Sequence, residues 1–197
     1  MIDISEVFLF SIVPENVKDL FFKERNLVFK SLGGDDFSHS DMLKYNNRES
    51  RYINRINDGH QCFGFVTPDG GIVSYLWLSG SLYGTSLVPF EAGTFCMIPD
   101  GSAYIWDCRT SPSYRRQGLY QEGLVRLVQR CGIEGNQNVF IVCRKNNIIS
   151  KNGIISVGFH CFGEAILIKL MRKLVVHISK YSIKKIGFGS LHVFNDY

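Results

Sequence analysis

The sequence lacks any long apolar stretch that is free of charge. Its longest apolar segment near the C-terminal end, residues 165–178, is broken by Lys169, Arg172 and Lys173. A helix that crosses a bilayer needs about 20 consecutive, predominantly apolar residues, so we expect this segment to pack within a folded domain. The first six residues contain no lysine or arginine, whereas a secretory signal peptide begins with a basic region. The sequence therefore predicts neither a membrane span nor a signal peptide.

Paired cysteines are also lacking. None of the six cysteines forms a C-x-x-C pair, the spacing that zinc sites and redox centres use. Cys62, Cys108 and Cys143 each lie within an apolar run, where a free thiol behaves as a small hydrophobic side chain. We therefore expect all six to be reduced, which is typical of a cytoplasmic protein. They stand at positions 62, 96, 108, 131, 143 and 161.

Charge of one sign is not in large excess. The 22 basic and 18 acidic residues give a formal net charge of +4, which suits an anionic ligand but is too small to indicate a nucleic-acid-binding protein. The basic residues between 169 and 185 are spaced within expected strands, and we interpret them as a solvated edge. The five histidines show no metal-ligand spacing, and the acidic residues are not paired as in a glycosidase. The sequence therefore predicts no metal site and no nucleic-acid partner.

Apolar residues make up 45% of the chain, enough for the core of a single α/β domain spanning residues 1–197. Hydrophobic periodicity predicts the element order β, α, α, β, β, β, α, β, α, β, followed by a strand-like tail. Three consecutive strands in the middle favour a mixed sheet over a doubly wound parallel one. We expect strands at residues 6–13, 61–66, 71–79, 102–110, 138–143 and 159–171, and helices at residues 14–33, 38–59, 118–131 and 147–157.

Two segments read as turns or loops. Residues 67–70 (TPDG) join two apolar strands, and a proline followed by a glycine in such a linker is typical of a β-hairpin turn. Residues 80–99 are less regular and contain Tyr83, Phe90 and Phe95. We expect a loop there, or a lid over a pocket.

The segment of most chemical interest is residues 112–120 (PSYRRQGLY), which stands between an apolar strand and an amphipathic helix. A turn that opens a helix exposes backbone N–H groups, and the helix dipole adds partial positive charge, so such a turn binds phosphate. Arg115, Arg116 and Gln117 add side-chain donors, and Gly118 removes the Cβ where a ligand must approach the backbone. The residues alone therefore predict a pyrophosphate-binding turn, with a solvated basic turn as the alternative.

This segment resembles a motif of the GNAT N-acetyltransferase superfamily. The family pattern Arg/Gln-x-x-Gly-x-Gly/Ala follows a strand, and here Arg115, Gly118 and Tyr120 occupy its positions, with Tyr in place of the last Gly or Ala.

A second family pattern, Asn-x-x-Ala/Ser followed by Gly-Phe, is similar to Asn147, Ser150 and residues 158–159. Two motifs in the right order, separated by a strand, are more specific than either alone. The resemblance covers the second half of the chain by motif and the first half only by element order.

The resemblance implies a GNAT-like fold, with a mixed central β-sheet flanked by helices and two strands that splay apart into an acyl-CoA cleft. It implies that backbone groups of residues 108–110 bind the pantetheine arm, that amides of residues 116–120 hold the pyrophosphate, and that Asn147 and Ser150 contact the arm from the other side. The expected CoA-binding residues are Cys108, Arg109, Thr110, Arg115, Arg116, Gln117, Gly118, Leu119, Tyr120, Asn147 and Ser150.

The implied reaction is direct attack of a small amine on the thioester of acetyl-CoA, which acts as co-substrate. This reaction needs a route for the amine proton, a donor for the oxyanion and a proton for the leaving thiolate. We expect the backbone N–H of Cys108 to stabilise the oxyanion. Asp107 is expected either to relay the amine proton or to pair with Arg109 or Arg115. Alternation along the strand places Trp106 on the side opposite Asp107.

One position departs from the family in a way that bears on mechanism. The family's usual general acid is a Tyr seven residues after the motif Asn, and here that position is Ile154. Tyr120 and His160 remain as candidate proton carriers, each more typical of a structural role.

The departure leaves two alternatives open: a CoA-binding module without acyl transfer, and an acyltransferase that uses a longer acyl donor, for which residues 80–99 could line a tunnel. The expected partners are acetyl-CoA and a small amine, and a homodimer is left open.

Overall fold

The computed structural model describes residues 2–38, 48–80, 82, 87–89, 95–170 and 173–179. Its main strands are β1 (Ile2–Ile12), β2 (Val28–Leu32), β3 (Gln61–Val66), β4 (Ile72–Gly80), β7 (Ser102–Thr110), β8 (Asn138–Arg144), β9 (His160–Leu170) and β10 (Lys173–Ser179). The short strands β5 (Leu87–Pro89) and β6 (Phe95–Met97) pair with each other. The α-helices are α1 (Gly34–Ser38), α3 (Arg48–Asn57), α4 (Leu119–Ile133) and α5 (Ile148–Val157).

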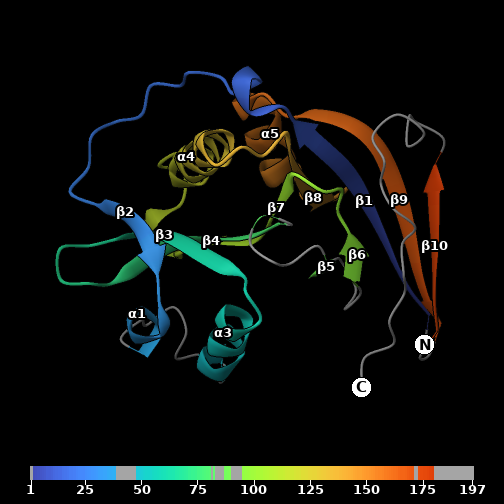
Figure 1. The fold of residues 1–197 in the computed structure, drawn as a ribbon, viewed down its shortest axis with the longest axis horizontal. Coiled ribbons are helices and arrows are strands. Elements are labelled where there is room, and N and C mark those ends of the chain that lie inside the picture. The colour runs from blue at the N-terminus through green and yellow to red at the C-terminus, as the bar shows by residue number, and fades with distance from the viewer. Residues whose placement is uncertain are drawn as a thin grey trace.

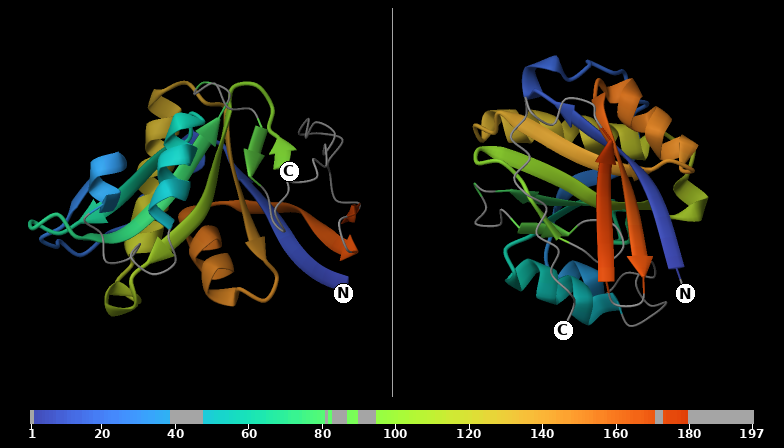
Figure 2. Two further views of the ribbon diagram at one scale, coloured as in Figure 1. Left: turned by 90° about the horizontal axis from the view of Figure 1, so that it is seen from below. Right: turned by 90° about the vertical axis from the view of Figure 1, so that its right-hand side faces the viewer.

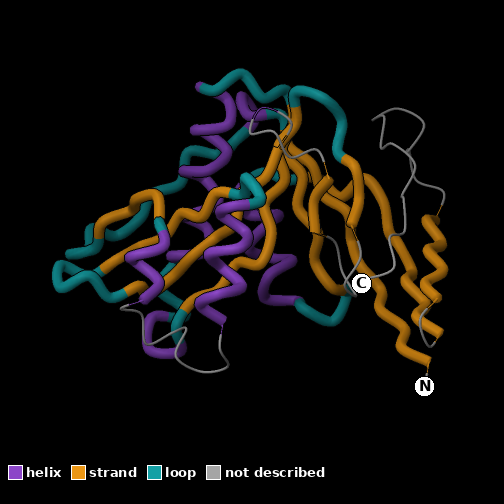
Figure 3. The backbone as a smooth tube through the Cα atoms, turned by 60° about the horizontal axis from the view of Figure 1, so that its bottom comes forward, coloured by secondary structure: helices purple, strands orange, loops and turns teal. Residues whose placement is uncertain are grey.

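The described strands form an eight-stranded mixed sheet in the order β10-β9-β1-β8-β7-β4-β3-β2. Neighbouring strands are antiparallel except for β7 and β8, which are parallel. The long strands β1, β9 and β10 extend together at one end of the molecule (Figure 3). The first strand of the chain thus lies between β8 and β9, next to the parallel pair. The predicted mixed sheet is confirmed.

Helices cover both faces of the sheet. In Figure 1 and Figure 2, α4 and α5 lie on one face, and α1 and α3 lie on the other. Two groups of buried apolar side chains match these layers, because alternate residues of each strand point to opposite faces. The group under α4 and α5 includes Leu76, Ile105, Leu124, Val128 and Ile154. The group on the α1 and α3 face includes Phe37, Tyr52, Trp77 and Trp106.

The helix predicted at residues 14–33 is wrong. The chain makes one 3-10 turn at Pro14–Asn16, continues without regular structure and then forms the edge strand β2. Phe21, in the middle of the predicted helix, is 98% exposed. Phe29 of β2 lies opposite Phe65 of β3, with ring centroids 4.9 Å apart. This cross-strand aromatic pair stabilises residues 28–32 as a strand more than a solvent-exposed helix would stabilise them.

The other predicted elements are largely confirmed. Residues 102–110 form β7 with the predicted bounds, and the hairpin at residues 67–70 joins β3 to β4, with Gly70 at φ +89°. Of the helix predicted at residues 38–59, the structure describes α3, and the rest lies outside the described residues. Half of the loop predicted at residues 80–99 also lies outside them, and the described part includes the paired strands β5 and β6, which the prediction of a loop missed. Within the described part of the chain, no helix is long and apolar enough to cross a membrane.

Candidate functional site

The parallel strands β7 and β8 separate partway along their length. Their pairing runs from Ser102 opposite Asn138 to Ile105 opposite Ile141, although β7 continues to Thr110 and β8 to Arg144. Beyond Ile105, the edge of β7 that faces β8 therefore has no neighbouring strand. A cleft of about 2040 Å³ opens at this place, lined by both strands, the hairpin between β3 and β4, the turn before α4 and one side of α5. The predicted splayed strands are confirmed.

The turn between β7 and α4 has an irregular backbone that opens the helix toward the cleft. Arg116 and Gly118 have φ values of +59° and +80°, and Gly118 is the N-cap residue of α4, so no side chain caps the helix start. Arg115 Nε donates to the Thr110 carbonyl at 3.2 Å, and Gln117 Nε2 donates to the Ser113 carbonyl at 3.3 Å. An uncapped helix start with positive-φ residues presents backbone donors to an anion.

Arg25, in the irregular segment before β2, stabilises this turn by hydrogen bonds. Its guanidinium donates to the Gln117 carbonyl and, at 2.7 Å, to Glu122 Oε2. Glu122 also accepts from Arg126, one turn further along α4, at 2.9 Å. Sequence analysis missed Arg25 because it placed the residue in a helix. The signal that could have found it is Glu122, an acidic residue on the buried side of α4, which requires a cationic partner.

The start of α5 borders the cleft on its other side. Asn147 is the N-cap residue, and its Oδ1 accepts from the Ser150 N–H at 3.2 Å. Ser150 Oγ lies 3.0 Å from the hydroxyl of Tyr120 on α4. Gly158, at φ +117°, ends the helix where an added Cβ would lie 2.9 Å from the Asn16 carbonyl. These motif residues thus shape α5, and the contacts of Asn147 and Ser150 with CoA stay predictions.

Ile154 does not face the cleft. Its side chain is 0% exposed and packs in the core under α4 and α5. The position where the resemblance implies a general acid therefore points into the apolar core.

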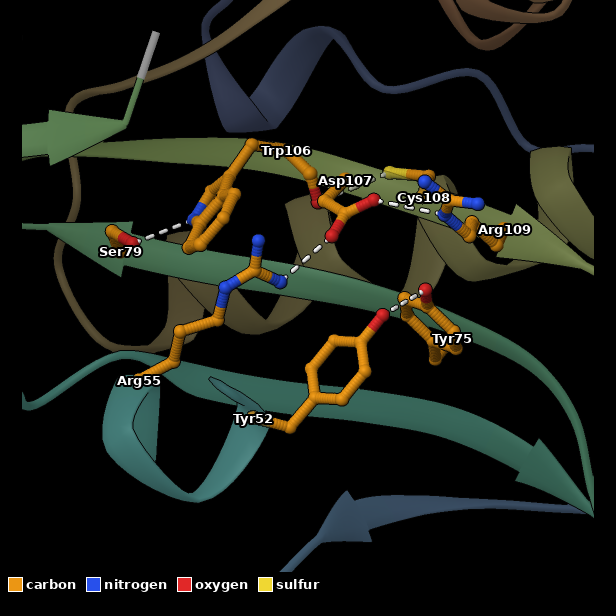
Figure 4. Close-up of polar contacts among 8 residues, drawn as sticks. All are labelled: Tyr52, Arg55, Tyr75, Ser79, Trp106, Asp107, Cys108 and Arg109. Carbon is orange, nitrogen blue, oxygen red and sulfur yellow. Dashed lines mark hydrogen bonds and ion pairs between the residues drawn. The ribbon is translucent and has the colours of Figure 1, made fainter. Parts of the chain in front are cut away.

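A second group of polar side chains lies at Asp107, on the face of the sheet that α3 covers (Figure 4). Arg55 Nη1 of α3 donates to Asp107 Oδ2 at 2.7 Å, and Arg109 Nε donates to Oδ1 at 3.1 Å. The Arg55 guanidinium lies 4.3 Å from the Trp106 ring centroid and also contacts Tyr52 and Trp77.

The prediction that Trp106 and Asp107 point to opposite sides is wrong. The register between β4 and β7 shifts between Tyr75 and Trp77, and Asp107 has φ +39°. A β-bulge of this kind interrupts the alternation of side chains, so both Trp106 and Asp107 contact Arg55. Of the two partners predicted for Asp107, the structure shows Arg109, whereas Arg115 binds the Thr110 carbonyl.

The electrostatics around Asp107 favour its charged form. Burial raises the pKa of the Asp107 carboxyl, but the hydrogen bonds and charges of Arg55 and Arg109 outweigh burial and leave the pKa below its usual value. A carboxylate with a lowered pKa is a weak base. The role of Asp107 as a proton relay stays a prediction, and its two ion pairs fit the alternative of an anchoring role.

Hydroxyl groups around this ion pair hold each other in place. The Tyr52 and Tyr75 hydroxyls lie 2.6 Å apart, and Trp106 Nε1 donates to Ser79 Oγ at 2.7 Å (Figure 4). Burial raises the pKa of Tyr75, and the Asp107 charge adds to the effect. Tyr75 is therefore neutral at physiological pH.

The side chains of Cys108 and His160, two further candidates for a chemical role, lie in surroundings that indicate a structural role instead. Burial raises the pKa of the Cys108 thiol well above its usual value, so this side chain is not a nucleophile at neutral pH. His160 begins β9, and its Nε2 lies 3.1 Å from Ser11 Oγ of β1. The role of the Cys108 backbone N–H stays a prediction. Among the described residues, no three His, Cys, Asp or Glu side chains gather as a metal site would require.

Comparisons with known proteins bear on the fold. A scan against protein-family models and a search of curated proteins found no match. The structure is similar to a GNAT-family acetyltransferase from Colwellia psychrerythraea, with a TM-score of 0.56 and 13% identity over 85% of this chain and 56% of that one. It is also similar to a GCN5-related N-acetyltransferase from Sphaerobacter thermophilus, with a TM-score of 0.56 and 10% identity over 89% of this chain and 51% of that one.

A putative GNAT-family acetyltransferase from Novosphingobium aromaticivorans matches with a TM-score of 0.53 and 14% identity, over 83% of this chain and 63% of that one. The chain thus spans about half to two thirds of the length of these structures. The similarity of overall structure, together with the mixed sheet of this chain and its separated strands β7 and β8, leads to one conclusion. The chain has the fold of the GNAT acetyltransferase superfamily.

Proposed function

We propose that the protein is an acyl-CoA-dependent N-acyltransferase that transfers the acetyl group of acetyl-CoA to a small primary amine by direct attack. The observation that carries the proposal is the cleft between the separated strands β7 and β8, with the uncapped start of α4 at its edge. An extended thioester ligand with a pyrophosphate group fits both parts, because the strand edge can bind amides and the helix start can bind phosphate.

The turn before α4 would bind the pyrophosphate of CoA. Backbone N–H groups of residues 116–120 would hold the pyrophosphate, with the exposed Arg115 and Arg116 guanidiniums nearby. Gly118 fits this role because its φ of +80° is costly for any residue with a Cβ. The pantetheine arm would lie along the edge of β7 at residues 108–110, and the Cys108 N–H would receive the oxyanion of the tetrahedral intermediate.

The surroundings of Asp107 bear on the acceptor. Two guanidiniums, Arg55 and Arg109, face one carboxylate, so the local charge is positive. A positive field lowers the pKa of a nearby amine and so favours the neutral, nucleophilic form. Water in the cleft can then take the amine proton during attack, and Asp107 holds Arg55 and Arg109 in place. A small acceptor suits this site better than a basic peptide, which two guanidiniums would repel.

The test is a screen of amine acceptors with acetyl-CoA, following free CoA thiol and the N-acetyl product by mass spectrometry. Amino acids, amino sugars and a lysine peptide form the panel. We expect turnover with a small amine, and CoA should raise the melting temperature of the protein. Efficient acetylation of the lysine peptide alone would contradict the small-acceptor part, and the absence of any thermal shift at saturating CoA would contradict the binding site.

A second candidate is a CoA-binding module without acyl transfer. The burial of Ile154 and the two ion pairs of Asp107 favour it, since neither group is then free to move a proton. Saturable CoA binding with no product from any acceptor would establish this alternative. Replacing acetyl-CoA by longer acyl-CoA donors in the same screen tests the donor length.

A further inference from the structure

The side chain of Tyr120 crosses from α4 to α5 at the place where β7 and β8 separate. Its hydroxyl lies 3.0 Å from Ser150 Oγ. Its ring packs on Gly153, where an added Cβ would lie 3.0 Å from the ring atom Cδ1 and 3.1 Å from Cε1. Real Cβ atoms seldom come this close to a ring, so a glycine at position 153 makes room for the tyrosine. The contacts of Gly153 and Ser150 together define the direction of the phenol.

The phenol lies beside the cleft rather than deep in the core. Tyr120 and Ser150 line the same cleft as Cys108 of β7 and Cys143 of β8. Burial raises the pKa of the Tyr120 hydroxyl well above its usual value, and the nearby Cys108 and Cys143 add to the effect. The group is therefore a protonated donor at neutral pH and not a base.

We propose that Tyr120 donates the proton to the leaving CoA sulfur, with Ser150 as the positioning residue that orients its hydroxyl. This inference rests on the proposed acyl transfer and assigns the acid that position 154 does not provide. Ile154 is buried on the core side of α5, whereas Tyr120 reaches the cleft side of the same helix from α4.

Acetyl transfer and protonation of the leaving sulfur occur in one step. The amine nitrogen forms a bond to the thioester carbon, the carbon–sulfur bond breaks, and its electron pair goes to sulfur. Tyr120 gives its hydroxyl proton to the sulfur, and CoA leaves as the thiol. Ser150, which is only partly buried, passes a proton from water to the tyrosinate, while the proton lost by the amine goes to water.

The first test needs no acceptor. A hydrogen bond from Tyr120 to sulfur stabilises the thiolate and therefore lowers the pKa of the bound CoA thiol. We titrate the ultraviolet absorbance of the thiolate in the CoA complex and subtract that of the desulfo-CoA complex, which removes the signals of Cys108 and Cys143. The thiol pKa should be higher in Tyr120→Phe than in the parent by about one pH unit or more.

Matched variants separate this effect from a general loss of structure. Ser150→Ala should raise the thiol pKa by a smaller amount, because Tyr120 is then present but less well oriented. Tyr104→Phe removes the hydroxyl of another buried tyrosine on β7, and Tyr104 does not line the cleft. It should leave the thiol pKa of bound CoA unchanged and should bind CoA as tightly as the parent. Each variant is titrated at a CoA concentration that saturates it, so that a weaker affinity does not alter the comparison of thiol pKa values.

The second test uses turnover once an acceptor is found. Tyr120→Phe should lower kcat by about 10²-fold or more, in the range that a general acid supplies, with little change in KM for acetyl-CoA. If CoA binds the parent and Tyr120→Phe changes neither the thiol pKa nor kcat, the inference is overturned and the proposed function stands. If CoA does not bind the parent, the proposed function fails and the inference fails with it.

Discussion

The Arg55 guanidinium of α3 and the Asp107 carboxylate of β7 are joined by a 2.7 Å contact at a bulge in the sheet. Their side chains are only 12% and 20% exposed, respectively. The pair connects the helix on one face of the sheet to the strand that borders the cleft. Asp107 has φ +39°, a conformation that costs free energy in a residue other than glycine. The ion pair therefore helps to hold the backbone next to Cys108 in a shape that it would not otherwise favour.

Asp107→Asn should lower the free energy of unfolding at pH 7 by about 3 kcal/mol, because removing one partner leaves Arg55 poorly compensated in a largely buried place. Chemical denaturation of the variant and the parent measures the difference. The control is Glu134→Gln, which breaks the more exposed pair with Arg130 on α4, whose side chains are 26% and 46% exposed, and should cost about 1 kcal/mol or less. Equal losses in the two variants would contradict the anchoring role of Asp107.

The difference between Asp107→Asn and the parent should depend on pH. The folded-state pKa of Asp107 is lowered, so its stabilisation is fully present above the unfolded-state pKa of about 3.9. It is lost as the pH falls from there through the folded-state pKa. Denaturation curves measured from pH 7 downward should therefore converge at the acidic end. A constant difference across this range would mean that the charge of Asp107 does not contribute.

Gly118→Glu should abolish CoA binding, because its carboxylate would lie at the helix start where we place the pyrophosphate. The variant also carries backbone strain, since Gly118 has φ +80°. Gly135→Glu is the matched control: Gly135 has φ +86°, lies beyond the other end of α4 and has nothing within 4 Å of an added Cβ. Calorimetry should show CoA binding to Gly135→Glu and not to Gly118→Glu. Loss of binding in both would show that strain, and not the turn, accounts for the effect.

Ile154→Tyr should destabilise the protein and should not supply an acid. Ile154 is 0% exposed, and inserting a larger side chain into a packed core costs about 1–3 kcal/mol. Ile155→Tyr, at the neighbouring and 43% exposed position of α5, is the control and should change stability little. Thermal unfolding of the two variants compares them. A stable Ile154→Tyr with raised turnover would show that position 154 can reach the cleft after all.

The sequence predicts the second half of the fold well, and physical reasons separate its successes from its failures. The strand at residues 102–110, the helix α4 and the helix α5 each have a clear periodicity and a matching end signal, such as Asn147 before α5 and Gly158 after it. These elements also bring the predicted turn and the two splayed strands together. Periodicity predicts these elements, whereas the expectation that two strands splay into a cleft comes from the family resemblance of the two motifs at residues 115–120 and 147–159. The cleft is also lined by residues of the hairpin between β3 and β4, such as Thr67 and Ile72, which the resemblance by motif does not cover.

The failures arise where contacts between distant parts of the chain decide the local structure. Residues 14–33 have apolar residues at helical spacing, but Phe29 pairs with Phe65 and Arg25 reaches Glu122 on α4. The bulge at Asp107 depends on its pairing with β4 and on Arg55. These long-range contacts have no signature in the nearby sequence. Because the bulge could not be foreseen, simple alternation along the strand placed Trp106 on the wrong side of the sheet.

Arg25 provides a test of how far the irregular segment before β2 controls the turn. Its guanidinium contacts the Gln117 carbonyl and Glu122, and the exposed fractions of the Arg25 and Glu122 side chains are 16% and 9%. Arg25→Ala should lower the free energy of unfolding by about 3 kcal/mol, because Glu122 then keeps only its contact with Arg126 in a buried place. It should also weaken CoA binding, since the turn at residues 116–118 loses the contact that fixes its carbonyl.

The control for Arg25→Ala is Arg126→Ala, which removes the other partner of Glu122. The Arg126 side chain is 50% exposed and lies over the Phe29 ring of β2, 5.5 Å from the ring centroid. We expect it to cost less than about 1 kcal/mol and to leave CoA affinity unchanged. Denaturation and calorimetry on both variants separate the two roles of Arg25. If Arg25→Ala destabilises the protein but binds CoA as tightly as the parent, the segment stabilises α4 without shaping the turn, and the pyrophosphate site depends on Gly118 and the helix start alone.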